Sequence, residues 1–287
     1  METVTHEIKV RNPHFDFDQV PRHWVLNNPI MTHFINSMHI VFPDGEKFFI
    51  RSVRKFSKNI TDPKLKKDVK GFCGQEGVHA REHERFWEVM EAQGLNPEGF
   101  AEFLNKTAFR GDKSLESLII KICDRIKPGL GDKMALSLTA GLEHYTAILA
   151  NALFHEPMAT NKNMAPQMLE LLHWHASEEI EHKAVSFDVL KQVDDDYALR
   201  ITGMVLASIA LWGYLGIGQL YFISQDKEID YTKTPAYLFE FVKTIAFGEI
   251  GRGLTKNLLK YFERDFHPND IDDRYLSEEF FADKSYA

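Results

Sequence analysis

Cysteine is scarce in this sequence, and signals for secretion or nucleic-acid binding are lacking. The chain of 287 residues has two cysteines, Cys73 and Cys123, which are too few and too far apart for a thiolate zinc site or a disulfide framework. No apolar run follows a basic start at the N-terminus, so we expect no secretory signal and a reduced, cytoplasmic setting. With 34 basic against 42 acidic residues, the net charge of −8 argues against binding to nucleic-acid phosphates.

Histidine and phenylalanine, in contrast, are abundant. The chain has 13 histidines and 22 phenylalanines. Imidazole is a common metal ligand, and phenylalanine forms dry pocket walls. The question is therefore whether some of the histidines share a helical face with carboxylates.

The clearest motif is HWHASEEIEHK at residues 173–183. On a helix, His175, Glu179 and His182 point within one narrow arc and could bind the same metal. Glu178 and Glu181 point away from this arc, so we interpret them as solvated groups or as hydrogen-bond partners of the ligands. Glu179-x-x-His182 is the type of pair that helix bundles offer to a metal.

A second Glu-x-x-His pair occurs roughly a hundred residues earlier, within QEGVHAREH at 75–83. It consists of Glu76 and His79. His83 lies one turn further along the same face, either as a ligand or as a hydrogen-bond partner outside the ligand shell. Glu46 and Glu143 are single carboxylates on two other helical segments with apolar neighbours, where a charge needs a partner.

The order Glu, ExxH, Glu, ExxH is typical of ferritin-like bundles that hold two carboxylate-bridged metals. We predict an all-α protein with a ferritin-like four-helix bundle and extra C-terminal helices: an arm at 1–28, the bundle at 29–195, and an apolar helix with a C-terminal extension at 196–287. Four carboxylates carry −4, which two divalent cations would neutralise. The predicted metal ligands are Glu46, Glu76, His79, Glu143, His175, Glu179 and His182.

The boundaries of the bundle helices follow from apolar periodicity and from Pro and Gly. The first helix begins at Ile30, and we expect it to break or restart near Pro43. A helical hairpin should occupy 95–131. The other bundle helices are expected at 62–92, 132–153 and 165–193.

Two resemblances add to this interpretation. The spacing His175-x3-Glu179-x2-His182 resembles that of the p-aminobenzoate N-oxygenase group of di-iron enzymes, which implies that His175 is a seventh ligand. Over about residues 10–275, the PDGE segment at 43–46, the two histidine stretches and YFERDFHPND at 261–270 resemble the bacterial family of predicted metal-dependent hydrolases.

Oxygen chemistry is the first functional hypothesis. A carboxylate-rich site with imidazoles suits two Fe ions, with Mn/Fe, Mn or Zn as alternatives. We expect an oxidoreductase that activates dioxygen, takes electrons from a donor and oxidises an apolar or aromatic small molecule. The alternative is a di-metal hydrolase that uses a metal-bound hydroxide. Iron storage suits the chain less well, because storage needs a cage. Without any metal, the Glu and His side chains would have to satisfy each other in a polar core.

The segment 201–224 is the longest apolar run, with 24 uncharged residues. Its length could cross a bilayer. Three interpretations stay open: a membrane span, a helix lying on a membrane surface, or a helix that covers the bundle. The sequence is also compatible with a homodimer.

Overall fold

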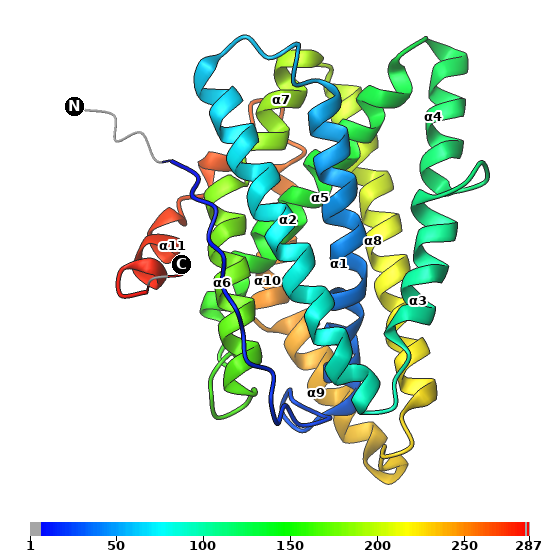
Figure 1. Ribbon diagram of the computed structural model, residues 1–287, viewed down its shortest axis with the longest axis vertical. Helices are drawn as coiled ribbons and strands as arrows, with labels where there is room; N and C mark the ends of the chain where they lie inside the picture. The colour runs from blue at the N-terminus through cyan, green and yellow to red at the C-terminus, as the bar shows by residue number, and fades with distance from the viewer. Residues whose placement is uncertain (1–6, 285, 287) are drawn as a thin grey trace.

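The protein is a bundle of helices (Figure 1). The computed structural model describes residues 7–284 and 286, and within these the only strand pairing is an isolated bridge between Val25 and Met164. The predicted all-α class is confirmed. The helices are α1 (Pro29–Lys55), α2 (Pro63–Ala92), α3 (Pro97–Leu104), the π-helical turn η1 (Asn105–Phe109), α4 (Leu115–Ile126), α5 (Leu130–His155), α6 (Pro166–His182), α7 (Val185–Val193), α8 (Tyr197–Gln225), η2 (Tyr231–Lys233), α9 (Thr234–Phe247), α10 (Glu249–Lys260), η3 (Pro268–Asp270) and α11 (Arg274–Phe281).

The helices α1, α2, α5 and α6 surround the centre of the molecule, and α8 packs along α1 and α5. The helical hairpin predicted at 95–131 is wrong: α3, η1 and α4 follow one another along one side of the bundle and connect its two ends without folding back (Figure 1). The helices α10 and α11 pack outside α5 and α6. The bundle therefore places four helices around one shared interior.

Local signals explain where the first two helices begin and end. The Asn28 side chain accepts hydrogen bonds from the first turn of α1, and Asp62 does the same for α2. Each is followed by a proline at the first helical position, where no backbone N–H is needed. The loop after α2 contains Gly94 with φ +82°, a conformation that favours glycine.

The predicted break at Pro43 is wrong, because α1 runs through it without interruption. An interior proline costs about 3 kcal/mol through a lost hydrogen bond and a steric clash. Here Pro43, Asp44 and Gly45 are all buried, and α1 carries buried residues on both sides of the proline. Tertiary packing therefore outweighs the local preference for a break.

The fourth predicted helix, 165–193, is in fact two helices. The first of them, α6, ends at His182, and the second, α7, starts at Val185. The side chain of Lys183 between them is 5% exposed, forms an ion pair with Asp273 and donates a hydrogen bond to the Ile271 carbonyl at 2.6 Å. Burying this ammonium group against a distant loop stabilises the turn, and sequence periodicity gave no sign of that contact.

The helix α8 contains the long uncharged segment, and among the described residues it alone is long and apolar enough to cross a membrane. One face packs closely on the bundle: a Cβ on Gly203 would lie 2.0 Å from Ser137 Oγ, and one on Gly218 would lie 2.7 Å from the Phe100 ring. Only 33% of its most apolar window is buried. The helix therefore covers the bundle with one face and leaves an apolar face outside.

Candidate metal centre

The seven predicted ligands meet in the interior of the bundle. They come from α1, α2, α5 and α6. None is more than 5% exposed. The set comprises Glu46 from α1, Glu76 and His79 from α2, Glu143 from α5, and His175, Glu179 and His182 from α6.

One candidate metal position lies around His182. Its Nε2 atom is 3.1 Å from an oxygen of Glu76, 3.4 Å from Glu179 and 3.5 Å from Glu143. Three carboxylates thus approach one imidazole nitrogen. This is a suitable donor set for a divalent cation.

A second position lies around His79 and His175. The Nδ1 atom of His79 is 3.5 Å from Glu179 and 3.8 Å from Glu76. The Nε2 atom of His175 is 2.9 Å from Glu179 and 3.8 Å from Glu46. Glu76 and Glu179 border both positions, so both carboxylates would help to hold a pair of cations there.

Most of the donor atoms that face this interior lack hydrogen-bond partners of acceptable geometry; the exception is the pair His175 Nε2 and Glu179 Oε1, which are hydrogen-bonded at 2.9 Å. Each unpartnered buried polar atom costs about 1–3 kcal/mol, and so many in one place call for an explanation. Divalent cations would satisfy them together, which is the observation that fits the residues to a metal pair. The unpartnered atoms are both carboxylate oxygens of Glu46, Glu76 and Glu143, Oε2 of Glu179, Nδ1 of His79 and Nε2 of His182.

Hydrogen bonds behind the ligands set the orientation of two imidazoles. His79 Nε2 lies 3.0 Å from Glu178, so in a neutral ring that binds a metal the N–H would be on Nε2 and Nδ1 would present its lone pair to the interior. His182 Nδ1 lies 2.8 Å from the Gln75 carbonyl oxygen, which leaves Nε2 free in the same way. Metal-bound histidines are normally held by such partners.

Arg11 of the N-terminal arm forms hydrogen bonds that hold Glu178 directly and Gln75 through Glu181. Its guanidinium donates to Glu178 at 3.0 Å and to Glu181 at 2.7 Å. The amide of Gln75 donates to Glu181 at 2.8 Å. No spacing in the sequence reveals the role of Arg11, because it lies more than 160 positions from its partners.

A row of buried histidines continues from His175. Its Nδ1 lies 2.7 Å from His83 Nε2, and His83 Nδ1 lies 2.7 Å from Nδ1 of His39. When His175 offers Nε2 to a metal, its Nδ1–H donates to His83, which in turn donates to His39. Burial and the neighbouring His175 lower the pKa of His83 well below its usual value, consistent with a neutral ring. The Nε2 atom of His83 lies 4.0 Å from Glu46, and Glu46, His83 and His175 form a group with the geometry for a metal, so the role of His83 outside the ligand shell stays a prediction.

Charge in the metal-free centre is unevenly distributed. Burial, reinforced by Glu76, raises the pKa of Glu46 and of Glu143 well above the usual value. Burial would also raise the pKa of Glu179, but His182 and further histidine contacts outweigh it and lower that pKa well below the usual value. The metal-free interior therefore holds protons that cations would displace.

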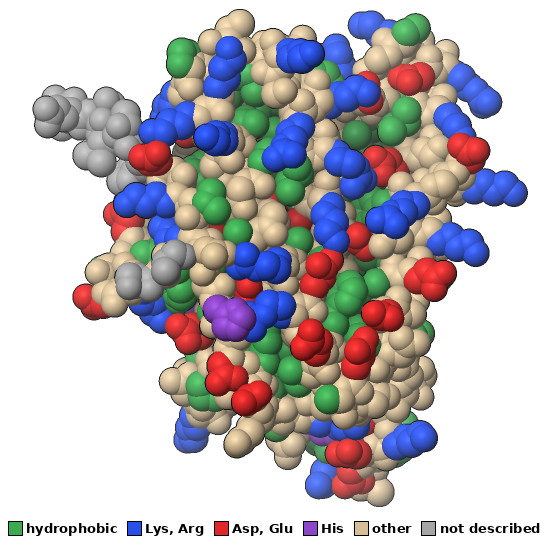
Figure 2. Space-filling model, in the orientation of Figure 1, with side chains coloured by type: hydrophobic (Ala, Val, Ile, Leu, Met, Phe, Trp, Pro, Cys, Tyr) green, Lys and Arg blue, Asp and Glu red, His purple; other side chains and the backbone are tan. Residues whose placement is uncertain are grey.

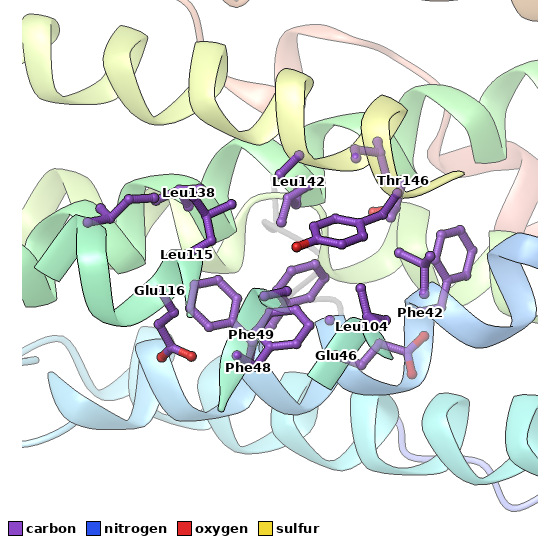
Figure 3. Close-up of a pocket in the computed structure, with 18 of the residues that line it drawn as sticks. Phe42, Glu46, Phe48, Phe49, Leu104, Leu115, Glu116, Leu138, Leu142 and Thr146 are labelled. Atoms are coloured by element: carbon purple, nitrogen blue, oxygen red, sulfur yellow. The ribbon is translucent and has the colours of Figure 1, made fainter. Parts of the chain in front are cut away.

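Two apolar cavities reach the ligands from outside. The first, of about 90 Å³, lies between α1, α4, α5 and α8 and reaches Glu46 and Glu179 (Figure 3). The second, of about 100 Å³, reaches His175 and Glu179 from beside α8, α9 and α10. Phe42 lies between them and lines both. Their walls are almost entirely hydrocarbon, which predicts apolar occupants.

Another cluster, His23, His33 and Asp226, has the geometry for a metal but is explained without one. The Asn36 carbonyl accepts from Trp24, so its amide group faces His33 Nδ1 at 3.4 Å. The N–H of His33 is then on Nε2 and donates to Asp226 at 2.9 Å. This cluster ties the N-terminal arm to the end of α8.

A family model described as predicted metal-dependent hydrolase matches residues 9–272. The chain belongs to this family. Comparisons with curated proteins and with solved structures gave no match. The family description favours the alternative of a di-metal hydrolase, and dioxygen activation stays a prediction.

Proposed function

We propose that the chain is a hydrolase of apolar esters or amides that depends on two divalent cations. The observation that carries the proposal is the convergence of unpartnered carboxylate and imidazole atoms at the inner ends of two apolar cavities. A pair of cations held there would polarise the scissile group and lower the pKa of a water molecule.

The protein's own residues would orient the ligand side chains and exclude bulk water from the site. Glu178 and Gln75 hold the ligand histidines in one tautomer. Phe42 and Phe49 line the approach to Glu46, so bulk water is kept from the reacting group. The hydrocarbon walls would select a substrate with an apolar acyl or aromatic part.

The first experiment measures metal content and hydrolysis together. Protein stripped of metal is reconstituted without oxygen with Zn²⁺, Mn²⁺ or Fe²⁺, and assayed with p-nitrophenyl esters from acetate to dodecanoate and with matching anilides. We expect activity that requires metal and grows with acyl length. Glu143→Gln removes a ligand carboxylate and should abolish activity. Glu84→Gln, a surface carboxylate paired with Lys47, is the matched control.

The result against the proposal would be about two bound cations without hydrolysis of any ester or anilide. Hydrolysis that persists unchanged in Glu143→Gln would also contradict it, because the activity would then lie elsewhere.

Dioxygen activation is the second candidate. Its support is the pairing of two Glu-x-x-His motifs with two further glutamates, the donor pattern of carboxylate-bridged di-iron bundles. Loss of activity without oxygen, or oxygen uptake that needs a reductant, would favour this candidate. Activity that is the same with and without oxygen would favour the hydrolase.

A further inference from the structure

The outer face of α8 is an uncharged stripe along the whole helix. No charged residue occurs between Arg200 and Asp226. Ile209 and Leu220 are each 68% exposed, although large aliphatic side chains are usually buried. Exposed apolar patches of this kind commonly mark interaction sites. The exposed positions of the stripe are Thr202, Val205, Ile209, Gly213, Ile217, Leu220 and Ser224.

The helix α9 extends this apolar surface. Of its 14 residues only Thr244 is buried, and Phe239 and Phe247 are 72% and 70% exposed. The two helices meet over Phe34 of α1, whose ring lies 6.4 Å from Trp212 of α8 and 5.4 Å from Phe241 of α9. Phe34 thus connects the inner sides of the two helices, and we call the exposed stripe of α8 together with the exposed side chains of α9 the α8–α9 face.

The segment that carries α9 and α10 differs in charge from the rest of the chain. Residues 227–260 contain six Lys and Arg and four Asp and Glu, whereas the chain as a whole has a net charge of −8. One of these acids, Glu249, is paired with Arg252. In contrast, Figure 2 shows acidic and basic side chains interspersed over the face formed by α1 and α2.

We propose that the α8–α9 face docks on a bilayer that contains anionic phospholipids. Exposed phenylalanines beside lysines are the combination that binds the interface of such a bilayer. The helix α8 would lie on the membrane, because its other face packs on the bundle so closely that Gly203 leaves no room for a Cβ beside Ser137.

The helices that carry the α8–α9 face also line both cavities. Trp212 and Ile245 line the second cavity, and Tyr214 lines the first. An apolar substrate could therefore pass from the lipid toward Glu179 without crossing water. This consequence rests on the proposed function, whereas docking itself requires neither metal nor activity.

The test is co-sedimentation of the full chain with vesicles of phosphatidylcholine alone and of phosphatidylcholine with phosphatidylglycerol. We expect binding to the anionic vesicles that weakens as salt is added. Phe239→Ser with Phe247→Ser should lower the partition coefficient by about tenfold or more. The control, Val10→Ser with Tyr275→Ser, removes side chains that are 51% and 46% exposed on other elements and should leave binding unchanged.

A second pair of variants tests the charge. Lys243→Glu with Lys256→Glu should weaken binding to anionic vesicles by more than about tenfold. The same reversal at Lys66 and Lys70, exposed on α2, should have a much smaller effect.

Two results would overturn the proposal. One is the absence of sedimentation with either vesicle. The other is a stable dimer that Phe239→Ser with Phe247→Ser dissociates, which would identify the face as an interface between two copies. Because binding is measured on the metal-free protein as well, failure of docking and failure of hydrolysis can be told apart.

Discussion

Replacing Arg11 by methionine should weaken metal binding from outside the ligand shell. The substitution keeps most of the hydrocarbon stem and removes the guanidinium that donates to Glu178 and Glu181. Glu178 is fully buried, so its carboxylate would keep the His79 N–H but lose its charge partner. Without Arg11 to orient it, the Glu178 carboxylate should fix the orientation of the His79 ring less firmly.

The magnitude follows from burial. Removing one partner of a fully buried ion pair costs about 3–5 kcal/mol. The side chains of Arg11 and Glu181 are 14% and 13% exposed, so water can replace part of the lost interaction, and we expect about 2 kcal/mol of unfolding free energy. Loss of support behind a ligand weakens metal affinity by about 10–100-fold.

Two measurements on the same variants check this prediction: denaturant unfolding of the metal-free protein and calorimetric titration with Mn²⁺. The matched control is Arg51→Met, whose ion pair with Glu116 at 3.1 Å involves an arginine side chain that is 52% exposed. An exposed pair of this kind contributes about 0–1 kcal/mol. The reasoning is refuted if Arg11→Met and Arg51→Met bind Mn²⁺ with equal affinity.

Three further predictions concern stability. Burial alone would raise the pKa of Asp226, but hydrogen bonds from His33 and His23 outweigh it and hold that pKa below its usual 3.8. Asp226→Asn should therefore lower the free energy of unfolding by about 2 kcal/mol at neutral pH. In urea unfolding this difference should be constant down to about pH 4 and should shrink at lower pH, as the wild-type carboxyl is protonated. Gly203→Ala should cost about 1–3 kcal/mol by overpacking against Ser137, whereas Gly213→Ala, with open space around it, should stabilise α8 by up to about 1 kcal/mol. Chelation should lower the unfolding temperature of the metal-loaded protein, and a Glu143→Gln variant should show a smaller decrease.

The spacing of residues within single helices was sufficient to predict most residues of the candidate site. Glu76 with His79, and Glu179 with His182, are separated by three positions, and a helix places both members of such a pair on one face. Glu46 and Glu143 followed because carboxylates on apolar faces need partners. The structure brings all of these residues into one interior.

The residues that support the ligands could not be found in this way. Arg11 and His39 come from segments distant in sequence, and nothing near them marks their role. The first cavity likewise requires α4 and α8 to lie against α1 and α5, an arrangement that no single segment specifies.

Local sequence determined the helical class, the two Glu-x-x-His pairs and the apolar character of 201–224, because each depends on the chemistry of neighbouring residues along one helix. Tertiary structure decided that α1 continues through Pro43, that α6 ends at His182, and that Arg11 stands behind two ligand histidines. These outcomes depend on contacts between distant segments, whose free energies can outweigh a local preference of a few kcal/mol. The same packing decided that α8 buries one apolar face and exposes the other.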